Sequence, residues 1–96
     1  MIEKIKSAVL KGRIEWQKHA LERMLERRIA RSSVKEVLLV GELIESYSND
    51  KPYASYLVSG RGGSEVYHVV VAYDENSETC FIITCLLYTS PSPRDS

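Results

Sequence analysis

The residues best suited to chemistry in this sequence lie together in residues 18–28. His19, Arg23 and Arg27 recur at intervals of four, so on a helix they stand one turn apart along one side. An imidazole beside guanidinium groups can act on a phosphodiester, because the imidazole accepts a proton while the arginines hold the phosphate. The alternative interpretation is a solvated helix face that only carries charge.

A second histidine, His68, lies in the stretch most typical of a strand, residues 65–73, which is rich in Val and Tyr. The alternation puts His68 on the same face as Val66, Val70 and Ala72, opposite the face of Tyr67, Val69, Val71 and Tyr73. A lone histidine there is usually a hydrogen-bonded structural residue. Its functional interpretation requires His19 or Arg23 to lie near it in space.

The glycine-rich residues 60–63 predict a flexible hairpin loop, with Arg61 at its tip able to contact a phosphate. They do not form a P-loop, because the Gly-Lys-Ser/Thr ending and the following helix are missing. Cys80 and Cys85 are five residues apart, which in a regular strand puts them on opposite faces. We therefore expect neither a disulfide nor a metal between them, and no cofactor.

The composition predicts one small soluble domain. The 96 residues are 44% hydrophobic and 27% charged, and their net charge is zero. Residues 1–31 hold nine Lys and Arg against four acidic residues, and residues 32–96 show the reverse, four against nine. This asymmetry suits either a polyanionic partner for the first part or attraction between the two parts of one fold. With no apolar run long enough to cross a bilayer and no signal peptide, we expect a cytoplasmic location and no membrane contact.

The elements that must position these residues are three helices followed by four strands. Helical spacing predicts helices at residues 2–11, 17–28 and from a capping box at Ser33 and Glu36 to Gly41, with 13–16 as an extended connector. Alternation predicts strands at 43–48, 53–59, 65–73 and 79–84. We therefore expect an α+β fold with the N-terminal helices on a four-stranded antiparallel sheet. The expected core is Leu21, Leu25, Val37, Leu38, Val69 and Val71.

The last twelve residues, 85–96, differ from everything before them and end in a Ser- and Pro-rich stretch. They resemble a translated sequencing adapter, so we expect a single domain at 1–84 and an adapter-derived tail at 85–96 outside the fold. The natural sequence would then continue differently after Thr84.

Residues 14–84 resemble a family of small bacterial and archaeal proteins, domain of unknown function 4258. The resemblance rests on six short motifs in a fixed order: His-Ala-Leu-Glu-Arg-Met at 19–24, Arg-Arg-Ile at 27–29, Val-x-x-Val-Leu at 34–38, Gly-Glu-Leu-Ile-Glu at 41–45, Tyr-His-Val-Val-Val-Ala-Tyr at 67–73 and Ile-Ile-Thr at 82–84. The family is similar to the RelE-like and BrnT-like toxins of toxin–antitoxin systems. The resemblance implies that toxin fold, RNA as substrate, and a cognate antitoxin as partner, such as a zinc-finger helix-turn-helix protein.

Two functions follow from these residues. In the first, the chain is the toxin of a type II toxin–antitoxin system, a metal-independent endoribonuclease that cleaves mRNA. His19 or His68 takes the proton of the 2′-hydroxyl, Arg23 stabilises the developing charge, and Arg27 and Arg61 bind RNA. In the second, the same basic helix face serves a non-catalytic module that binds RNA or protein.

Overall fold

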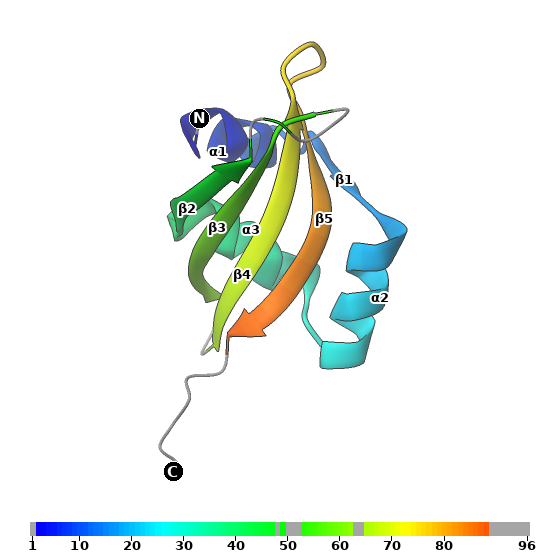
Figure 1. Ribbon diagram of the computed structural model, residues 1–96. Helices are drawn as coiled ribbons and strands as arrows, with labels where there is room; N and C mark the ends of the chain where they lie inside the picture. Colours follow the sequence, from blue (N-terminus) through cyan, green and yellow to red (C-terminus); the bar gives the residue numbers. More distant parts are fainter. Residues whose placement is uncertain (1, 48, 50–52, 63–64, 89–96) are drawn as a thin grey trace.

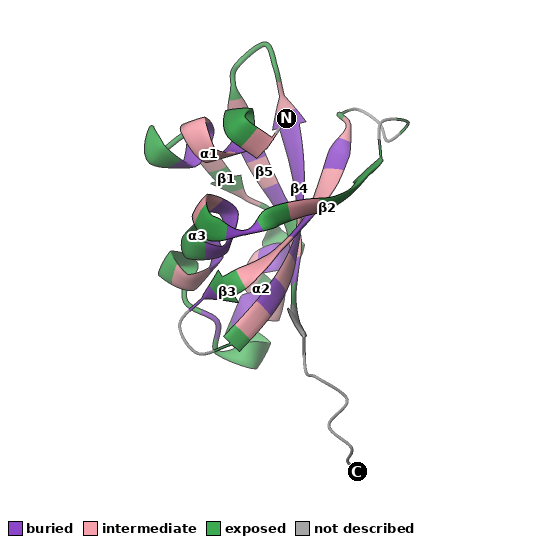
Figure 2. Cartoon of the chain, turned by 90° about the vertical axis from the view of Figure 1, so that its left-hand side faces the viewer, coloured by how far each residue is buried: buried purple, intermediate pink, exposed green. Residues whose placement is uncertain are grey.

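The computed structural model describes residues 2–47, 49, 53–62 and 65–88. In chain order the elements are α1 (Ile2–Leu10), β1 (Ile14–Trp16), α2 (Lys18–Arg27), α3 (Arg31–Val40), β2 (Glu42–Tyr47), β3 (Ser55–Gly62), β4 (Glu65–Asp74) and β5 (Thr79–Tyr88). All three helices lie on the same side of the sheet (Figures 1 and 2). Each contributes residues to one cluster of buried side chains. The α+β class is therefore confirmed, and the opposite face of the sheet carries none of these helices.

The sheet differs from the expected one in strand number and direction. It has five strands in the order β1-β5-β4-β3-β2, and β1 runs parallel to β5. The prediction of four antiparallel strands was wrong because residues 14–16 form an edge strand instead of a connector. Ile14 and Trp16 both pack against the core, opposite Cys80 and Ile82, and an extended chain along the sheet edge turns both side chains inward.

Helix α2 is rotated relative to the prediction. Its buried residues are Ala20 and Met24, while Leu21 is partly buried and Leu25 is 82% exposed. Leu25 follows Met24 by about 100° around the helix, which carries it beyond the apolar stripe. The stripe is instead centred between Leu21 on one side and Arg23 on the other, so Arg23 lies at the margin of the packed face.

The remaining core prediction is largely confirmed. Val37, Leu38, Val69 and Val71 are all fully buried, and the Tyr67 side of β4 is the inward one. Helix α3 begins at Arg31, two residues before the predicted capping box, and its N-cap residue Ala30 makes no side-chain hydrogen bond.

Two glycines of the expected flexible loop, Gly60 and Gly62, belong to strand β3 and contact helix α3, and Gly63 lies outside the described residues. A Cβ atom at Gly60 would lie 2.8 Å from the Cα of Gly41 and 3.0 Å from the carbonyl oxygen of Val37. A Cβ atom at Gly62 would lie 2.7 Å from the carbonyl oxygen of Ser33. These distances are shorter than normal van der Waals contacts, so glycine is required for α3 to approach the strand this closely.

Strand β5 contains an irregularity that changes which residues face the core. Val70 pairs with Thr84, whereas Val71 pairs with Ile82, so Ile83 is an extra residue in β5. The bulge reverses the alternation, and Cys80 and Cys85 are both buried instead of lying on opposite faces. Burial raises the pKa of the Cys80 thiol to about 12 and that of Cys85 to about 11.

The same strand continues beyond Thr84. Cys85 is 1% exposed and pairs with Val69, and β5 ends at Tyr88. The division into a domain at 1–84 and a tail at 85–96 stays a prediction. Residues 89–96 of the expected tail lie outside the described residues, and the adapter origin of 85–96 stays a prediction.

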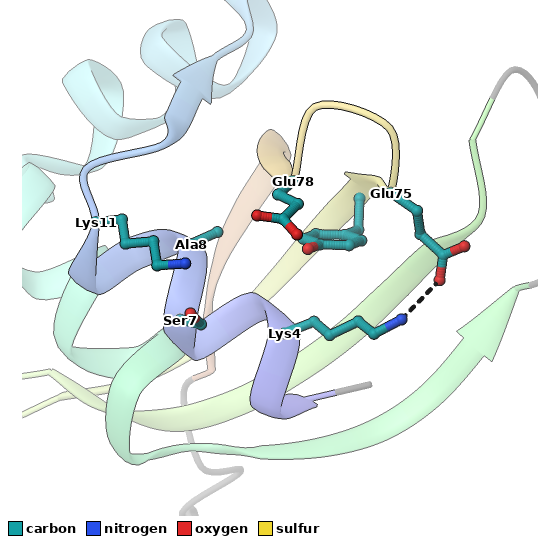
Figure 3. Close-up of a pocket in the computed structure, with 7 residues that line it drawn as sticks. Lys4, Ser7, Ala8, Lys11, Glu75 and Glu78 are labelled. Carbon is teal, nitrogen blue, oxygen red and sulfur yellow. Dashed lines mark hydrogen bonds and ion pairs between the residues drawn. The ribbon is translucent and has the colours of Figure 1, made fainter.

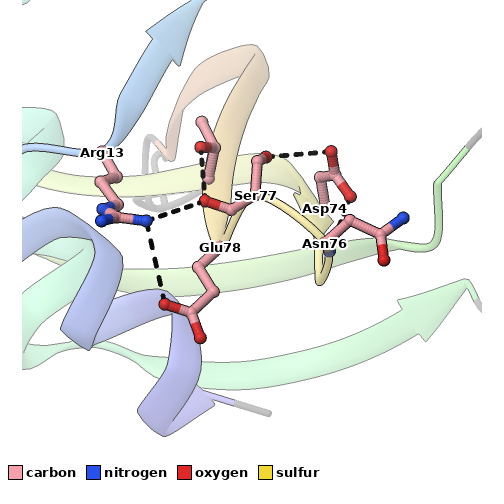
Figure 4. A network of polar contacts seen from close by, with 6 residues as sticks. Arg13, Asp74, Asn76, Ser77 and Glu78 are labelled. Atoms are coloured by element: carbon pink, nitrogen blue, oxygen red, sulfur yellow. Dashed lines mark hydrogen bonds and ion pairs between the residues drawn. The ribbon is translucent and has the colours of Figure 1, made fainter.

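Arg13 connects the start of β1 to the turn between β4 and β5 (Figure 4). Its Nη1 atom donates to the carbonyl oxygen of Ser77 at 3.1 Å and lies 3.9 Å from Oε1 of Glu78. Asp74 shapes the turn itself, accepting hydrogen bonds from the Asn76 amide at 3.0 Å and the Ser77 hydroxyl at 2.9 Å. These contacts fix the edge strand that leads directly into α2.

Candidate functional site

The helix residues His19, Arg23 and Arg27 share one side of α2. His19 and Arg27 are exposed. Arg23 is partly exposed, and its Nη1 lies 3.9 Å from Oε1 of Glu26, an ion pair within the helix. The three side chains are therefore accessible to a ligand.

The strand residues His68 and Arg61 lie on the open face of the sheet. Ser59 of β3 is directly opposite His68 of β4, and Arg61 is opposite Val66. Arg61 and His68 are thus diagonal neighbours, whose Cβ atoms are typically about 7–8 Å apart. A guanidinium group on its flexible stem can cross that distance, so both residues can contact one phosphate.

The two groups of residues are on opposite faces of the sheet. Val69, next to His68 in β4, is fully buried in the same cluster as Ala20 and Met24 of α2. Since successive side chains of a strand point to opposite faces, His68 points away from α2. A site in which His19 and His68 act on one phosphodiester is therefore excluded, and Arg61 cannot join the helix residues either.

The register adds two residues that the sequence analysis did not identify. Glu42 of β2 pairs with Ser59, which pairs with His68, so the three side chains form a row across three strands. His68 is half-buried and Glu42 is exposed. No local motif indicates this row, because it depends on the pairing of three strands that are separate in the sequence.

The strand group has the chemistry of a small phosphate site. An imidazole can accept or donate a proton, a guanidinium can bind a phosphate through two hydrogen bonds, and a serine hydroxyl can donate or accept. All three are attached to paired strands, which hold catalytic groups more rigidly than loops do. The helix group offers an imidazole and two guanidinium groups on one side of α2, without a serine hydroxyl.

A separate polar hollow of about 130 Å³ lies between α1 and the turn after β4 (Figure 3). Lys4 ion-pairs with Glu75 at 3.1 Å across one side of it, and this contact raises the pKa of the lysine. Burial raises the pKa of Tyr73, which also lines the hollow. Lys11 and Glu78 complete its charged lining, so positive and negative groups are balanced there. None of the predicted site residues lines this hollow.

The motifs on α2, α3 and the central strands identify the family. The family model for a domain of unknown function, DUF4258, matches residues 16–86, so the chain belongs to this family. The match begins at Trp16, the last residue of β1, and ends at Leu86 of β5, so it covers α2, α3, β2, β3, β4 and most of β5.

No curated protein and no solved structure matched the chain. Among the helices of the described residues, none has both the length and the apolar composition needed to cross a bilayer.

Proposed function

We propose that this chain is a toxin of the RelE-like or BrnT-like kind, a metal-independent endoribonuclease whose site is the open sheet face around His68 and Arg61. The observation that supports the proposal is the pairing of β3 with β4, which puts an imidazole and a guanidinium on one face of two neighbouring strands. RNA is the substrate because it carries its own nucleophile, the 2′-hydroxyl.

In the proposed reaction the imidazole of His68 takes the proton of the 2′-hydroxyl. The 2′-oxygen attacks phosphorus, and the bond from phosphorus to the 5′-oxygen breaks. The products are a 2′,3′-cyclic phosphate and a 5′-hydroxyl, whose proton comes from water. Arg61 binds the non-bridging oxygens while their negative charge increases. A positioned general base contributes about 10²–10⁴-fold to such a reaction.

The basic side of α2 then has a different role. Arg23 and Arg27 bind the RNA backbone. This binding requires accessible positive charges, but the side chains need not all point at one phosphate. His19 contributes to this surface, not to proton transfer at His68. Binding there should weaken as salt increases, because phosphate contacts release counterions.

A second candidate function is a non-catalytic module that binds RNA or protein through the same side of α2. The exposure of His19 and Arg27 favours it, since a binding surface requires accessible side chains and no enclosed site. For the toxin, the proposed partner is a cognate antitoxin, such as a zinc-finger helix-turn-helix protein.

Induced expression of the 96-residue chain in a bacterial host tests the proposal. We expect growth arrest and loss of mRNA with the unaltered chain, and normal growth with His68→Ala or Arg61→Ala at the same protein level. Lys35→Ala is the control, since it removes an exposed positive charge on α3, which lies on the other side of the sheet from the open face. Normal growth and intact RNA with the unaltered, folded chain would favour the binding module.

A further inference from the structure

The open face of the sheet is more apolar than the solvated face of an antiparallel sheet normally is. Such faces are usually polar, because alternation sends apolar residues to the core. Here the three central strands present five apolar side chains larger than alanine to the open side: Leu57, Val66, Val70, Phe81 and Leu86. Leu86 is 48% exposed, and Ile83 at the bulge is 36% exposed. Figure 1 views this face, with α1 and α3 behind the sheet.

Two aromatic residues cover one end of this face. The rings of Tyr53 and Phe81 stack with centroids 5.4 Å apart and an interplanar angle of 7°. Ala72, which pairs with Phe81, is only 5% exposed although it belongs to the open side. One end of the open face is thus partly closed, while the surface around Leu57, Val70 and Leu86 lacks such a stack among the described residues.

Glutamates lie on both edges of this apolar surface. Glu42 and Glu45 of β2 pair with Ser59 and Leu57, so their side chains share the open side. Glu15 of β1 pairs with Phe81 on the opposite edge. All three glutamates are exposed. Acidic edges attract cationic side chains that flank an apolar ligand.

From these observations we infer that the open face binds an amphipathic helix of a second protein, with an apolar stripe flanked by Lys or Arg on both sides. Three strands about 4.8 Å apart span about 10 Å, which matches the diameter of a helix, about 10–12 Å. The apolar stripe would contact Leu57, Val70 and Leu86 of the central strands. Its basic flanks would reach the glutamates of β1 and β2.

A second copy of this chain lacks such a stripe, because the exposed large apolar residues on its described helices are Leu10, Leu25 and Val40, one on each helix. Leu25 also has Glu22 and Glu26 within one turn, and these would face the glutamates of β2. A partner with basic flanks avoids this repulsion. The inferred helix would also cover His68, which lies between Ser59 and Leu86. Resting on the proposed function, this contact would exclude RNA from the site and inhibit cleavage.

The test uses two fluorescent synthetic helices of about 18 residues, about five turns. They share one leucine stripe and differ only in having Lys or Glu flanks. Fluorescence anisotropy with the 96-residue protein should give at least tenfold tighter binding of the Lys-flanked helix. Val70→Lys should abolish this binding, whereas Leu25→Lys, an equally drastic change on α2, should not affect it. Glu42→Lys with Glu45→Lys should reverse the preference, whereas the matched pair Glu22→Lys with Glu26→Lys should leave it unchanged.

Several results would overturn the inference while circular dichroism shows every variant folded. One is equal affinity for the two helices, or binding that Val70→Lys does not change. Another is a dimer of the unaltered chain that Val70→Lys dissociates, since a second copy would then occupy the face. A third is binding of a single-stranded RNA, but of neither helix, that Val70→Lys abolishes. Helix binding is measured without RNA and RNA cleavage without either helix, so helix binding can succeed or fail independently of the proposed ribonuclease activity.

Discussion

His68 and Val69 are adjacent in β4, but their side chains lie on opposite faces of the sheet. Val69 is fully buried among residues of the helices, and His68 is half-buried on the side that carries none of the described helices. This relationship separates His68 from His19, so the two histidines cannot act on one phosphodiester.

The rotation of α2 predicts that substitutions at two neighbouring positions change the free energy of unfolding by very different amounts. Met24→Ala should lower the free energy of unfolding by about 2–5 kcal/mol, because Met24 is 4% exposed and its removal leaves a cavity. Leu25→Ala should change it by less than about 0.5 kcal/mol, because Leu25 is largely in solvent. Urea unfolding of both variants measures the difference. A larger loss for Leu25→Ala would show that the helix is rotated the other way.

The close approach of α3 to β3 predicts that Gly60 cannot be replaced. Gly60→Ala puts a methyl group 2.8 Å from the Cα of Gly41, and the resulting displacement should lower the free energy of unfolding by about 1–3 kcal/mol. Ser59→Ala is the control, since Ser59 is the neighbouring strand residue on the open face. Equal stability of the Gly60→Ala variant and the unaltered protein in urea would mean that helix and strand are farther apart than the structure has them.

The buried thiols predict a loss of stability in alkali. In the folded chain the pKa values are about 12 for Cys80 and about 11 for Cys85, against an ordinary value of 9.0. Below about pH 9 both states keep the protons, so the thiols cause no pH dependence. Above it the unfolded chain loses protons first, and the free energy of unfolding falls as pH rises to about 12.

From about pH 8 to pH 10 the expected decrease is on the order of 2 kcal/mol, measured by urea unfolding under reducing conditions. In a variant with Cys80→Ala and Cys85→Ala this decrease should largely disappear. A residual decrease starting near pH 10 is expected from Tyr67 and Tyr73, whose pKa values burial also raises. An unchanged decrease in the double variant would contradict the assignment to the thiols.

Much of the fold was predictable from periodicity because the core positions recur regularly. Val37, Leu38, Val69 and Val71 follow helical or alternating patterns and are all fully buried. The edge strand at 14–16 was missed because three residues are too short to show a pattern. The bulge at Ile83 was missed because one extra residue leaves no local mark and only reverses the alternation after it.

The candidate site was predictable as a set of residues but not as an arrangement. The sequence identifies His19, Arg23, Arg27, Arg61 and His68 by residue type and spacing. Which of them meet depends on the face of β4 that α2 covers, and on the register that pairs Ser59 with His68. Leu25 illustrates the same limit, since a ten-residue helix allows two plausible apolar stripes and packing selects one.

Cleavage of single-stranded RNA by purified proteins in EDTA tests the location of the site most directly. We expect the unaltered chain to form 2′,3′-cyclic phosphate ends, His68→Ala to be slower by about 10²–10⁴-fold, and His19→Ala to differ by only a few-fold. Circular dichroism establishes that all three proteins are folded. Full activity of His68→Ala together with loss of activity in His19→Ala would contradict a site on the open face and assign the chemistry to α2.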